Sequence, residues 1–371
     1  MLKICIVNPF EHGGGAEYQI SLLIDALSAD GGFEVHYLTH FIDARDRTRN
    51  YSVSVVGTGG PMPRLGYLMD ARSLYGKLRE IGPDVIYQRV ACAYTGVCAR
   101  YSLHSRVPMI WHVASDSDVA PRLLEPARNF VRQHLEKWAV SYGVRNASRI
   151  VVQTRRQNEL LQQNYGRSAD AQIANFHPAS AESIDKSGPL TVMWIANLKQ
   201  LKQPDVFVRL AERFRLRPDV RFIMVGAPAP AIGDQRWRTS LMQGIANAKN
   251  LEYVGQKTHA EVNQLLARSH VFVNTSTHEG FPNTFIQAWM RDVAVLSLSV
   301  DPDGVLEHER VGIAAHTEDG LEAALRRLIE DPQLLAAYAN RGREHAAAHH
   351  SLANTARLLQ LIRSYARRTE V

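Results

Sequence analysis

Charged residues in two short segments have the types and the spacing to bind a ligand that carries both phosphate and hydroxyl groups. Lys199 and Lys202 in "IANLKQLKQP" (195–204) offer ammonium groups to an anion. Glu279 in "HEGFPNTFIQAW" (278–289) accepts hydrogen bonds only when it is ionised, so it suits hydroxyl groups rather than phosphate. A helix is expected to begin at Pro282, and the first N–H groups of a helix bind phosphate.

Gln287 in the same segment has two interpretations of equal weight. Thr284 and Gln287 have the three-residue spacing of a capping box, in which the two side chains satisfy backbone N–H groups at the start of a helix. The alternative is that the Gln287 amide contacts the ligand.

Two segments in the first half of the chain also hold candidate residues. In "WHVASDSD" (111–118), His112 ends a strand-like run and Asp116 and Asp118 follow it. A single histidine is usually structural, but ligands of open α/β sheets bind at such strand ends. In "NPFEHGGGAEYQ" (8–19), consecutive glycines lead into a helix, which suits either a phosphate loop or a tight turn.

These segments require strands and helices that alternate along the chain. Short β-branched runs are separated by amphipathic ones, which predicts parallel sheets with helices on both faces. The expected strands are 3–8, 34–39, 84–89, 108–113, 149–154, 190–197, 220–226, 251–255, 270–276 and 293–299. The expected helices are 15–30, 71–82, 204–214, 259–269, 282–290 and 355–368.

The length of 371 residues and a polar, proline-containing stretch at 176–189 predict two domains. We place an N-terminal domain at 1–178 and a C-terminal domain at 187–351, each a doubly wound α/β unit. A helix at about 352–371 is expected to pack back on the first domain.

Composition narrows the classes of partner. The net charge of +6 is modest and no Lys/Arg block is present, which argues against nucleic acid. No apolar run approaches the ~18 residues of a membrane span. Three cysteines without metal spacing suit a reducing cytoplasm. His345 and His349 have helical spacing, but no cysteine or carboxylate accompanies them, so no metal site and no cofactor are expected.

Taken together, the motifs resemble the retaining family-4 glycosyltransferases, which have the GT-B fold of two Rossmann-like domains facing a central cleft. The resemblance covers nearly the whole chain. It is carried by Gly14-Gly15-Ala16-Glu17, by His112, by Lys202 in "ANLKQLKQP", and by Glu279-Gly280-Phe281-Pro282-Asn283 followed by Gln287.

The resemblance implies roles for these residues. Glu279 would contact hydroxyls of the donor sugar. The backbone of the next five residues would lie near the donor diphosphate: Gly280, Phe281, Pro282, Asn283 and Thr284. Lys202 would neutralise that diphosphate and His112 would lie near the donor sugar. The remaining assignments are a closing loop at Gly14 and Gly15, acceptor contacts at Glu17 and Asp116, and a base-binding loop at Gly255, Gln256 and Lys257.

Two positions depart from the family pattern. The family usually has Gly-Arg where this chain has Ala196-Asn197, so one of two diphosphate cations is replaced, and Lys199 is the nearest substitute. Gln287 stands where the second acid of an E-x7-E pair receives the ribose hydroxyls. An amide there can still accept one hydrogen bond.

The implied reaction is transfer of a sugar from a nucleotide diphosphate sugar to a hydroxyl of a glycan or lipid-linked acceptor, with retention and without a metal. Bacterial polysaccharide or glycoconjugate synthesis is the expected setting. The main alternative is a catalytically impaired member that binds a sugar nucleotide or a partner enzyme. A nucleotide-sugar epimerase shares the architecture, but Lys202 and Glu279 favour transfer.

A basic segment at 122–156 raises the possibility of peripheral binding to an anionic membrane, at the inner face of the cell membrane. It mixes Leu, Phe and Trp with Arg and Lys, as interfacial helices do. The alternative, which the sequence favours slightly, is a solvated helix whose apolar side packs on the first sheet.

Overall fold

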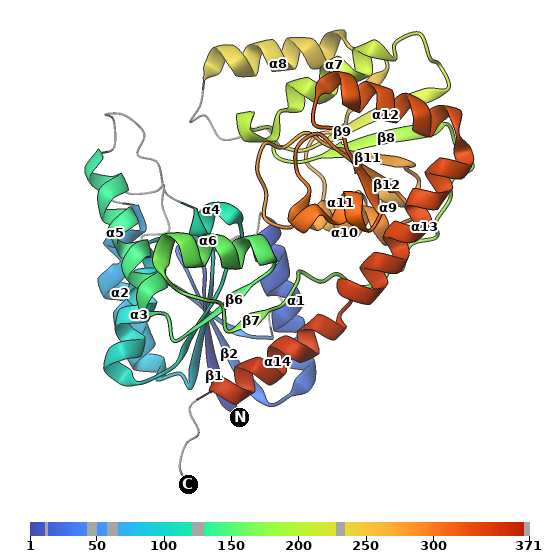
Figure 1. Cartoon of the computed structure of the whole chain (residues 1–371). Helices are drawn as coiled ribbons and strands as arrows, with labels where there is room; N and C mark the ends of the chain where they lie inside the picture. Colours follow the sequence, from blue (N-terminus) through green and yellow to red (C-terminus); the bar gives the residue numbers. More distant parts are fainter. Residues whose placement is uncertain (12–13, 43–49, 58–65, 121–129, 228–233, 367–371) are drawn as a thin grey trace. The chain divides into compact units, whose positions relative to one another are not determined.

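Two parallel β-sheets organise the chain, each within its own unit (Figure 1). One unit comprises Met1–Phe176 and Ala353–Val371, and the other comprises His177–Leu352. The computed structural model describes residues 1–11, 14–42, 50–57, 66–120, 130–227 and 234–366.

The first unit contains a sheet with the strand order β3-β2-β1-β4-β5-β6-β7, in which every pair is parallel. Its strands are β1 (Leu2–Val7), β2 (Phe33–Thr39), β3 (Ser52–Val55), β4 (Val85–Arg89), β5 (Met109–His112), β6 (Arg149–Val152) and β7 (Ala171–Gln172). Its helices are α1 (Gly15–Asp30), η1 (Gly66–Asp70), α2 (Ala71–Ile81), α3 (Ala93–Ser105), α4 (Asp116–Val119), α5 (Phe130–Asn146), α6 (Arg155–Tyr165) and α14 (Ala353–Tyr365).

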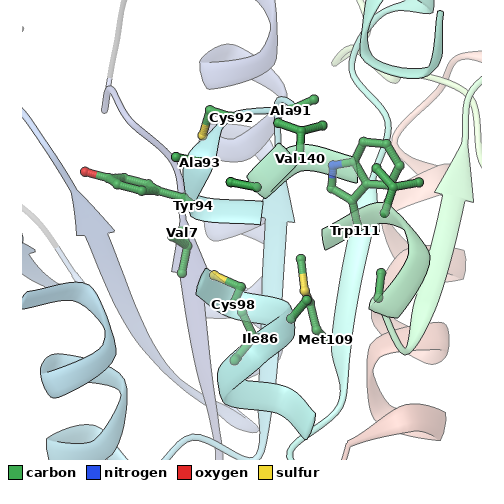
Figure 2. Close-up of a cluster of buried hydrophobic side chains, with 14 of the residues drawn as sticks. Val7, Ile86, Ala91, Cys92, Ala93, Tyr94, Cys98, Met109, Trp111 and Val140 are labelled. Carbon is green, nitrogen blue, oxygen red and sulfur yellow. The ribbon is translucent and has the colours of Figure 1, made fainter. Parts of the chain in front are cut away.

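Alternating side chains of the central strands supply two separate cores, one on each face of this sheet. Ile4 and Ile6 of β1 pack with residues of α1 and of the C-terminal helix α14. Val7 lies on the other face, in the cluster with Ile86 and Trp111 that α3 and α5 cover (Figure 2). Because both faces are covered, the strands are apolar almost throughout, as buried parallel strands are.

Helices α3 and α5 approach each other closely at two glycines. A Cβ on Gly96 would lie 2.5 Å from the Ala139 carbonyl oxygen, and a Cβ on Gly143 would lie 2.5 Å from the Thr95 carbonyl carbon. Any larger residue would therefore push the two backbones apart. The apolar side of α5 thus packs both on the sheet cluster, through Val140 and Val144, as the sequence had suggested, and against α3.

The second unit contains a parallel sheet with the order β10-β9-β8-β11-β12-β13. Its strands are β8 (Leu190–Ile195), β9 (Val220–Val225), β10 (Leu251–Tyr253), β11 (Val271–Asn274), β12 (Ala294–Ser297) and β13 (Gly312–Ala314). Its helices are η2 (Gln200–Lys202), α7 (Pro204–Arg213), α8 (Gln235–Asn247), α9 (His259–Ala267), α10 (Asn283–Trp289), η3 (Pro302–Gly304), α11 (Val305–His308), α12 (Glu318–Glu330) and α13 (Pro332–His349).

Each sheet reverses its strand order at one point, and this decides where the candidate residues gather. In the second unit the reversal lies between the neighbouring strands β8 and β11, and in the first it lies between β1 and β4. Connections leave in opposite directions there and open a crevice at the carboxyl ends of the strands, which is where such sheets bind ligands. The segments with Lys202 and Glu279 follow the two switch-point strands of the second unit.

The α/β fold class predicted from the sequence is confirmed, and each of the ten expected strands is present. The sequence missed β3, β7 and β13, which are two to four residues long and include both edges of the first sheet. Strands this short and this exposed carry too few apolar residues for a periodic signal.

Candidate functional site

In the second unit, hydrogen bonds join the segment after β8 to the segment after β11. The Thr277 amide donates to the Leu201 carbonyl at 3.0 Å. The Thr275 hydroxyl lies 2.7 Å from the Lys202 carbonyl and 2.9 Å from the Gln203 carbonyl. These contacts hold the backbone of Lys202 against the start of the loop that carries Glu279.

The structure brings Lys202 and Glu279 together as an ion pair between Nζ and Oε1. Ser276 donates a hydrogen bond from its hydroxyl to the same carboxylate oxygen at 2.8 Å. Each side chain of the pair is 20% exposed. A partly exposed ion pair contributes little to stability, so a ligand can separate its members at small cost. The ammonium and the carboxylate can then serve a phosphate and a hydroxyl respectively.

Thr275 and Trp194 support this arrangement, and sequence reasoning missed both. Trp194 is buried in β8 and donates from Nε1 to the Thr275 hydroxyl at 2.8 Å. The single Thr275 proton is therefore directed at the carbonyls of Lys202 and Gln203. The run Thr275-Ser276-Thr277 directly after a strand was the available signal, because hydroxyl residues at such ends bind neighbouring backbone.

The other residues of this unit that were predicted to bind the sugar-nucleotide donor lie at the strand ends and make fewer contacts. Asn197 and Lys199 are exposed, and the Lys199 amide donates to the Asn197 carbonyl at 2.8 Å. Gly255 adopts a φ of 70° and accepts a backbone hydrogen bond from Gly226 at 2.9 Å. Gln256 and Lys257 follow, and the Lys257 ammonium lies 3.3 Å from Glu261 on α9.

The capping box expected between Thr284 and Gln287 is not formed. Pro282 is the N-cap of α10 and makes no side-chain capping bond, so Gln287 lies two positions beyond the one that a capping box uses. Gln287 is instead 3% exposed and donates from Nε2 to Asn263 Oδ1 of α9 at 3.0 Å. Of the other residues in this turn, Gly280 is buried, Phe281 packs against Trp289 and His350, and Asn283 and Thr284 are partly exposed.

In the first unit, His112 is fully buried at the end of β5. Its Nδ1 lies 2.8 Å from the Tyr87 hydroxyl, and its Nε2 makes no well-aligned hydrogen bond with a described residue. Burial and the nearby Arg89 guanidinium hold the pKa of His112 well below its usual value, and the backbone of Ile173 only partly opposes them. His112 is therefore a neutral ring near pH 7.

The glycine loop of this unit follows β1, and the acidic residues Asp116 and Asp118 follow β5, the strand that ends at His112. Gly14 is the N-cap of α1, Gly15 is its first residue, and Gly13 lies outside the described residues. Glu17 accepts a hydrogen bond from the Asn8 side chain at 2.9 Å. Asp116 begins the short helix α4, whereas Asp118 accepts backbone hydrogen bonds from Ala114 and Ser115 and has a structural role.

The histidines near the C-terminus pack on an aromatic cluster of the second unit. The His345 ring lies 5.4 Å from Trp289 and 4.6 Å from His349, and burial lowers the pKa of His345 to about 4. His350 is buried in the same cluster. Among the described residues, no three His, Cys, Asp or Glu side chains gather as a metal site would require.

Comparisons with known proteins match both units. Residues 13–174 match the family described as "Glycosyltransferase Family 4", and residues 189–331 match "Glycosyl transferases group 1". The GtfA subunit of the UDP-N-acetylglucosamine–peptide N-acetylglucosaminyltransferase of Streptococcus pneumoniae is 28% identical over 157 residues, which is 40% of this chain and 30% of that protein. The chain therefore matches less than a third of the length of this curated relative.

Solved structures share the whole architecture. Sucrose-phosphate synthase from Thermosynechococcus elongatus superposes with a TM-score of 0.78 at 17% identity, covering 98% of this chain and 99% of that one. Anabaena HepE, solved with UDP and glucose, also has a TM-score of 0.78, at 20% identity, and covers 98% of this chain and 100% of its own. At these identities the likeness establishes the GT-B fold.

Proposed function

We propose that the chain transfers a sugar from a nucleotide diphosphate sugar to an acceptor hydroxyl with retention of configuration. The two glycosyltransferase family models, matched at residues 13–174 and 189–331, and the GT-B fold support this proposal. The acceptor is a glycan or a lipid-linked precursor, and the setting is bacterial polysaccharide or glycoconjugate synthesis.

The observation that carries this proposal is the ion pair between Lys202 and Glu279, whose members are 77 residues apart in the sequence. It presents a cation and a hydroxyl acceptor side by side at the switch point of the second sheet. A donor with a diphosphate and a sugar can replace the pair with two separate contacts. Lys202 then stabilises the negative charge that builds on the β-phosphate as the glycosidic bond breaks.

The remaining residues take supporting roles in this proposal. Glu279 holds donor-sugar hydroxyls, and the backbone of Gly280–Thr284 lies beside the diphosphate. In the first unit, His112 contacts the donor sugar, Gly14 and Gly15 close over the diphosphate, and the acceptor lies near Glu17 and Asp116. Asn197 and Lys199 are assigned to the diphosphate, Gly255, Gln256 and Lys257 to the base, and Gln287 to the ribose.

A uridine nucleotide is the first donor class to test, because HepE was solved with UDP and glucose and the GtfA relative is named for UDP-N-acetylglucosamine. A thermal-shift screen of UDP-, GDP- and ADP-sugars, followed by NMR of the product's anomeric proton, tests donor and stereochemistry together. Stabilisation by none of the donors, or a product with inverted configuration, would contradict the proposal. The reaction is proposed to be metal-independent, so EDTA should leave the rate unchanged.

A second candidate is a non-catalytic sugar-nucleotide-binding protein, favoured by Asn197 and by the engagement of the Gln287 amide with Asn263. Donor binding without donor hydrolysis or transfer would support it. If transferase activity appeared only in the double variant Asn197→Arg, Gln287→Glu, these two positions would be identified as the ones at which the chain lost its activity.

We also propose that α5 mediates peripheral contact with anionic lipid on the cytoplasmic face of the cell membrane. Val131, Leu135 and Trp138 are 62%, 39% and 66% exposed, and their spacing places them on one side of the helix. Arg132, Lys137 and Arg145 on the same helix outnumber its single acid, Glu136. Residues 122–129 of the basic segment lie outside the described residues, and no described helix has the length and apolarity to cross a membrane.

Flotation with vesicles tests this contact. The triple variant Val131→Ser, Leu135→Ser, Trp138→Ser should lose binding to anionic vesicles, because apolar insertion and basic attraction act together at such surfaces. Leu216→Ser is the matched control, since Leu216 is an exposed leucine of the other unit. Equal binding of the parent protein to anionic and neutral vesicles would contradict the proposal.

A further inference from the structure

Arg89, at the end of β4, is a buried cation whose partners among the described residues are all neutral. Its side chain is 1% exposed. Nη2 donates to Asn175 Oδ1 at 2.6 Å, Nη1 lies 3.4 Å from the Tyr87 hydroxyl, and Nε has no partner. No carboxylate of the described residues pairs with it. A buried guanidinium without a counter-charge destabilises a folded protein, so its position calls for a reason other than stability.

The hydrogen bonds of Tyr87 determine where the proton of His112 resides. The Tyr87 hydroxyl has two polar neighbours, Arg89 Nη1 and His112 Nδ1. Arg89 has donors and no acceptor, so it can only donate to the Tyr87 oxygen. The Tyr87 proton must then be donated to His112 Nδ1. A neutral imidazole whose Nδ1 accepts carries its own proton on Nε2.

The Nε2–H group that results is buried and makes no well-aligned hydrogen bond with a described residue, although the backbone of Ile173 acts on the ring and raises its pKa. Buried donors without a well-aligned acceptor are uncommon, and a ligand oxygen can complete them. His112 is the last residue of β5, which pairs with β4, one of the two switch-point strands of this sheet. The ring therefore presents one donor at the edge where such sheets bind ligands.

We propose that Tyr87 and Arg89 are positioning residues that hold His112 in its neutral form with the proton on Nε2, as a hydrogen-bond donor to an oxygen of the bound substrate. Arg89 acts in two ways. It orients the Tyr87 hydroxyl toward His112, and its positive charge opposes protonation of the imidazole. Only the kinetic consequence rests on the proposed function, because the protonation state of His112 can be measured without a substrate.

The first test is nitrogen NMR of the full chain labelled with ¹⁵N-histidine. The His112 signals are identified by their absence in His112→Gln. In the parent protein at pH 7 we expect a pyridine-type Nδ1 and a protonated Nε2. In Tyr87→Phe, which removes the hydroxyl that donates to His112 and accepts from Arg89, the two nitrogens should shift toward the averaged values of a tautomer mixture. A protonated Nδ1 in the parent, or an unchanged spectrum in Tyr87→Phe, would overturn the proposal.

The second test is steady-state kinetics with the same variants. Tyr87→Phe should lower kcat about fivefold with little change in KM, since one neutral hydrogen bond is worth about that factor. Tyr94→Phe is the matched control, because Tyr94 is equally buried and also loses one hydroxyl bond, to Asp70. Equal kcat losses in the two variants would assign Tyr87 a structural role. If Tyr87→Phe does not fold, both measurements are made on Arg89→Met. An unchanged His112 spectrum in that variant would overturn the role of Arg89.

Discussion

Lys202 in one unit and Arg89 in the other are both cationic side chains near the carboxyl ends of parallel strands, and they are held in opposite ways. Lys202 is partly exposed and paired with Glu279. Arg89 is buried, and its partners in the described part of the chain, Asn175 and Tyr87, are neutral. The first arrangement costs little to rearrange, so it suits a group that must leave its partner for a ligand. The second arrangement is costly to form and is already in place before a ligand binds, so it suits a group that fixes the protonation state of a neighbouring side chain.

The largest effect is expected from Lys202→Ala. Loss of a charge-assisted contact of about 1.5–3 kcal/mol should lower turnover by at least roughly tenfold. Because the Lys202–Glu279 pair is partly exposed, the free energy of unfolding should change by less than about 1 kcal/mol. Initial rates and thermal unfolding measure the two quantities.

The matched control for Lys202→Ala is Lys249→Ala, which removes an exposed lysine of the same unit. Full activity of Lys202→Ala with an unchanged unfolding curve would remove Lys202 from the mechanism. A large drop in unfolding temperature would instead make its role structural.

Arg89→Met is expected to have a moderate effect, in which the rate falls while the stability is unchanged or rises. Replacing an uncompensated buried charge by an apolar side chain of similar length should leave the unfolding temperature unchanged or raise it. The value of kcat should fall about fivefold, because the Tyr87 hydroxyl loses the donor that orients it. Differential scanning calorimetry and steady-state kinetics distinguish this outcome from a structural role, in which both quantities would fall.

Stability should decrease as the pH falls from about 6.5 toward 4, through histidines in both units. Burial holds the pKa of His112 well below its usual value and lowers the pKa of His177 to about 4. In this window the unfolded chain binds protons that the folded chain does not, so the free energy of unfolding rises with pH. Each fully buried histidine contributes up to about 1.4 kcal/mol per pH unit.

Urea unfolding at several pH values measures this slope. His177→Phe should reduce it, whereas His104→Phe should not, because His104 is exposed. A slope that is identical in the parent protein and in His177→Phe would show that His177 titrates normally in the folded state.

The smallest effect is expected from Gln287→Glu. A carboxylate at this position would face Asn263 Oδ1, so the Asn263 amide must turn over to donate, and a buried charge is added. We expect a loss of about 1 kcal/mol in the free energy of unfolding at pH 8 and a smaller loss at pH 5, where the carboxyl group is protonated. Equal stability of parent and variant at both pH values would show that the Gln287 site is open to water.

The sequence predicted the parallel sheets because buried β-branched runs and amphipathic helices have distinct periods. It also marked Lys202 and Glu279, since charged residues directly after strands are easily recognised. It could not predict Thr275 and Trp194, whose partners lie more than 70 residues away. The capping box at Thr284 failed for a related reason. Its spacing is local, but the start of α10 at Asn283 and the packing of Gln287 on α9 are decided by the neighbouring elements.

What the amino-acid sequence determined by itself is the order of the elements and the identity of the charged groups at their ends. Both depend on the periodicity and composition of segments of about ten residues, because local preferences determine the backbone conformation over that length. The tertiary structure alone decided that Lys202 meets Glu279, that the described partners of Arg89 are neutral, and that the Tyr87 hydroxyl lies beside His112 Nδ1. These contacts join residues of different strands and of the segments that follow them, and strand order and burial exist only once the chain has folded.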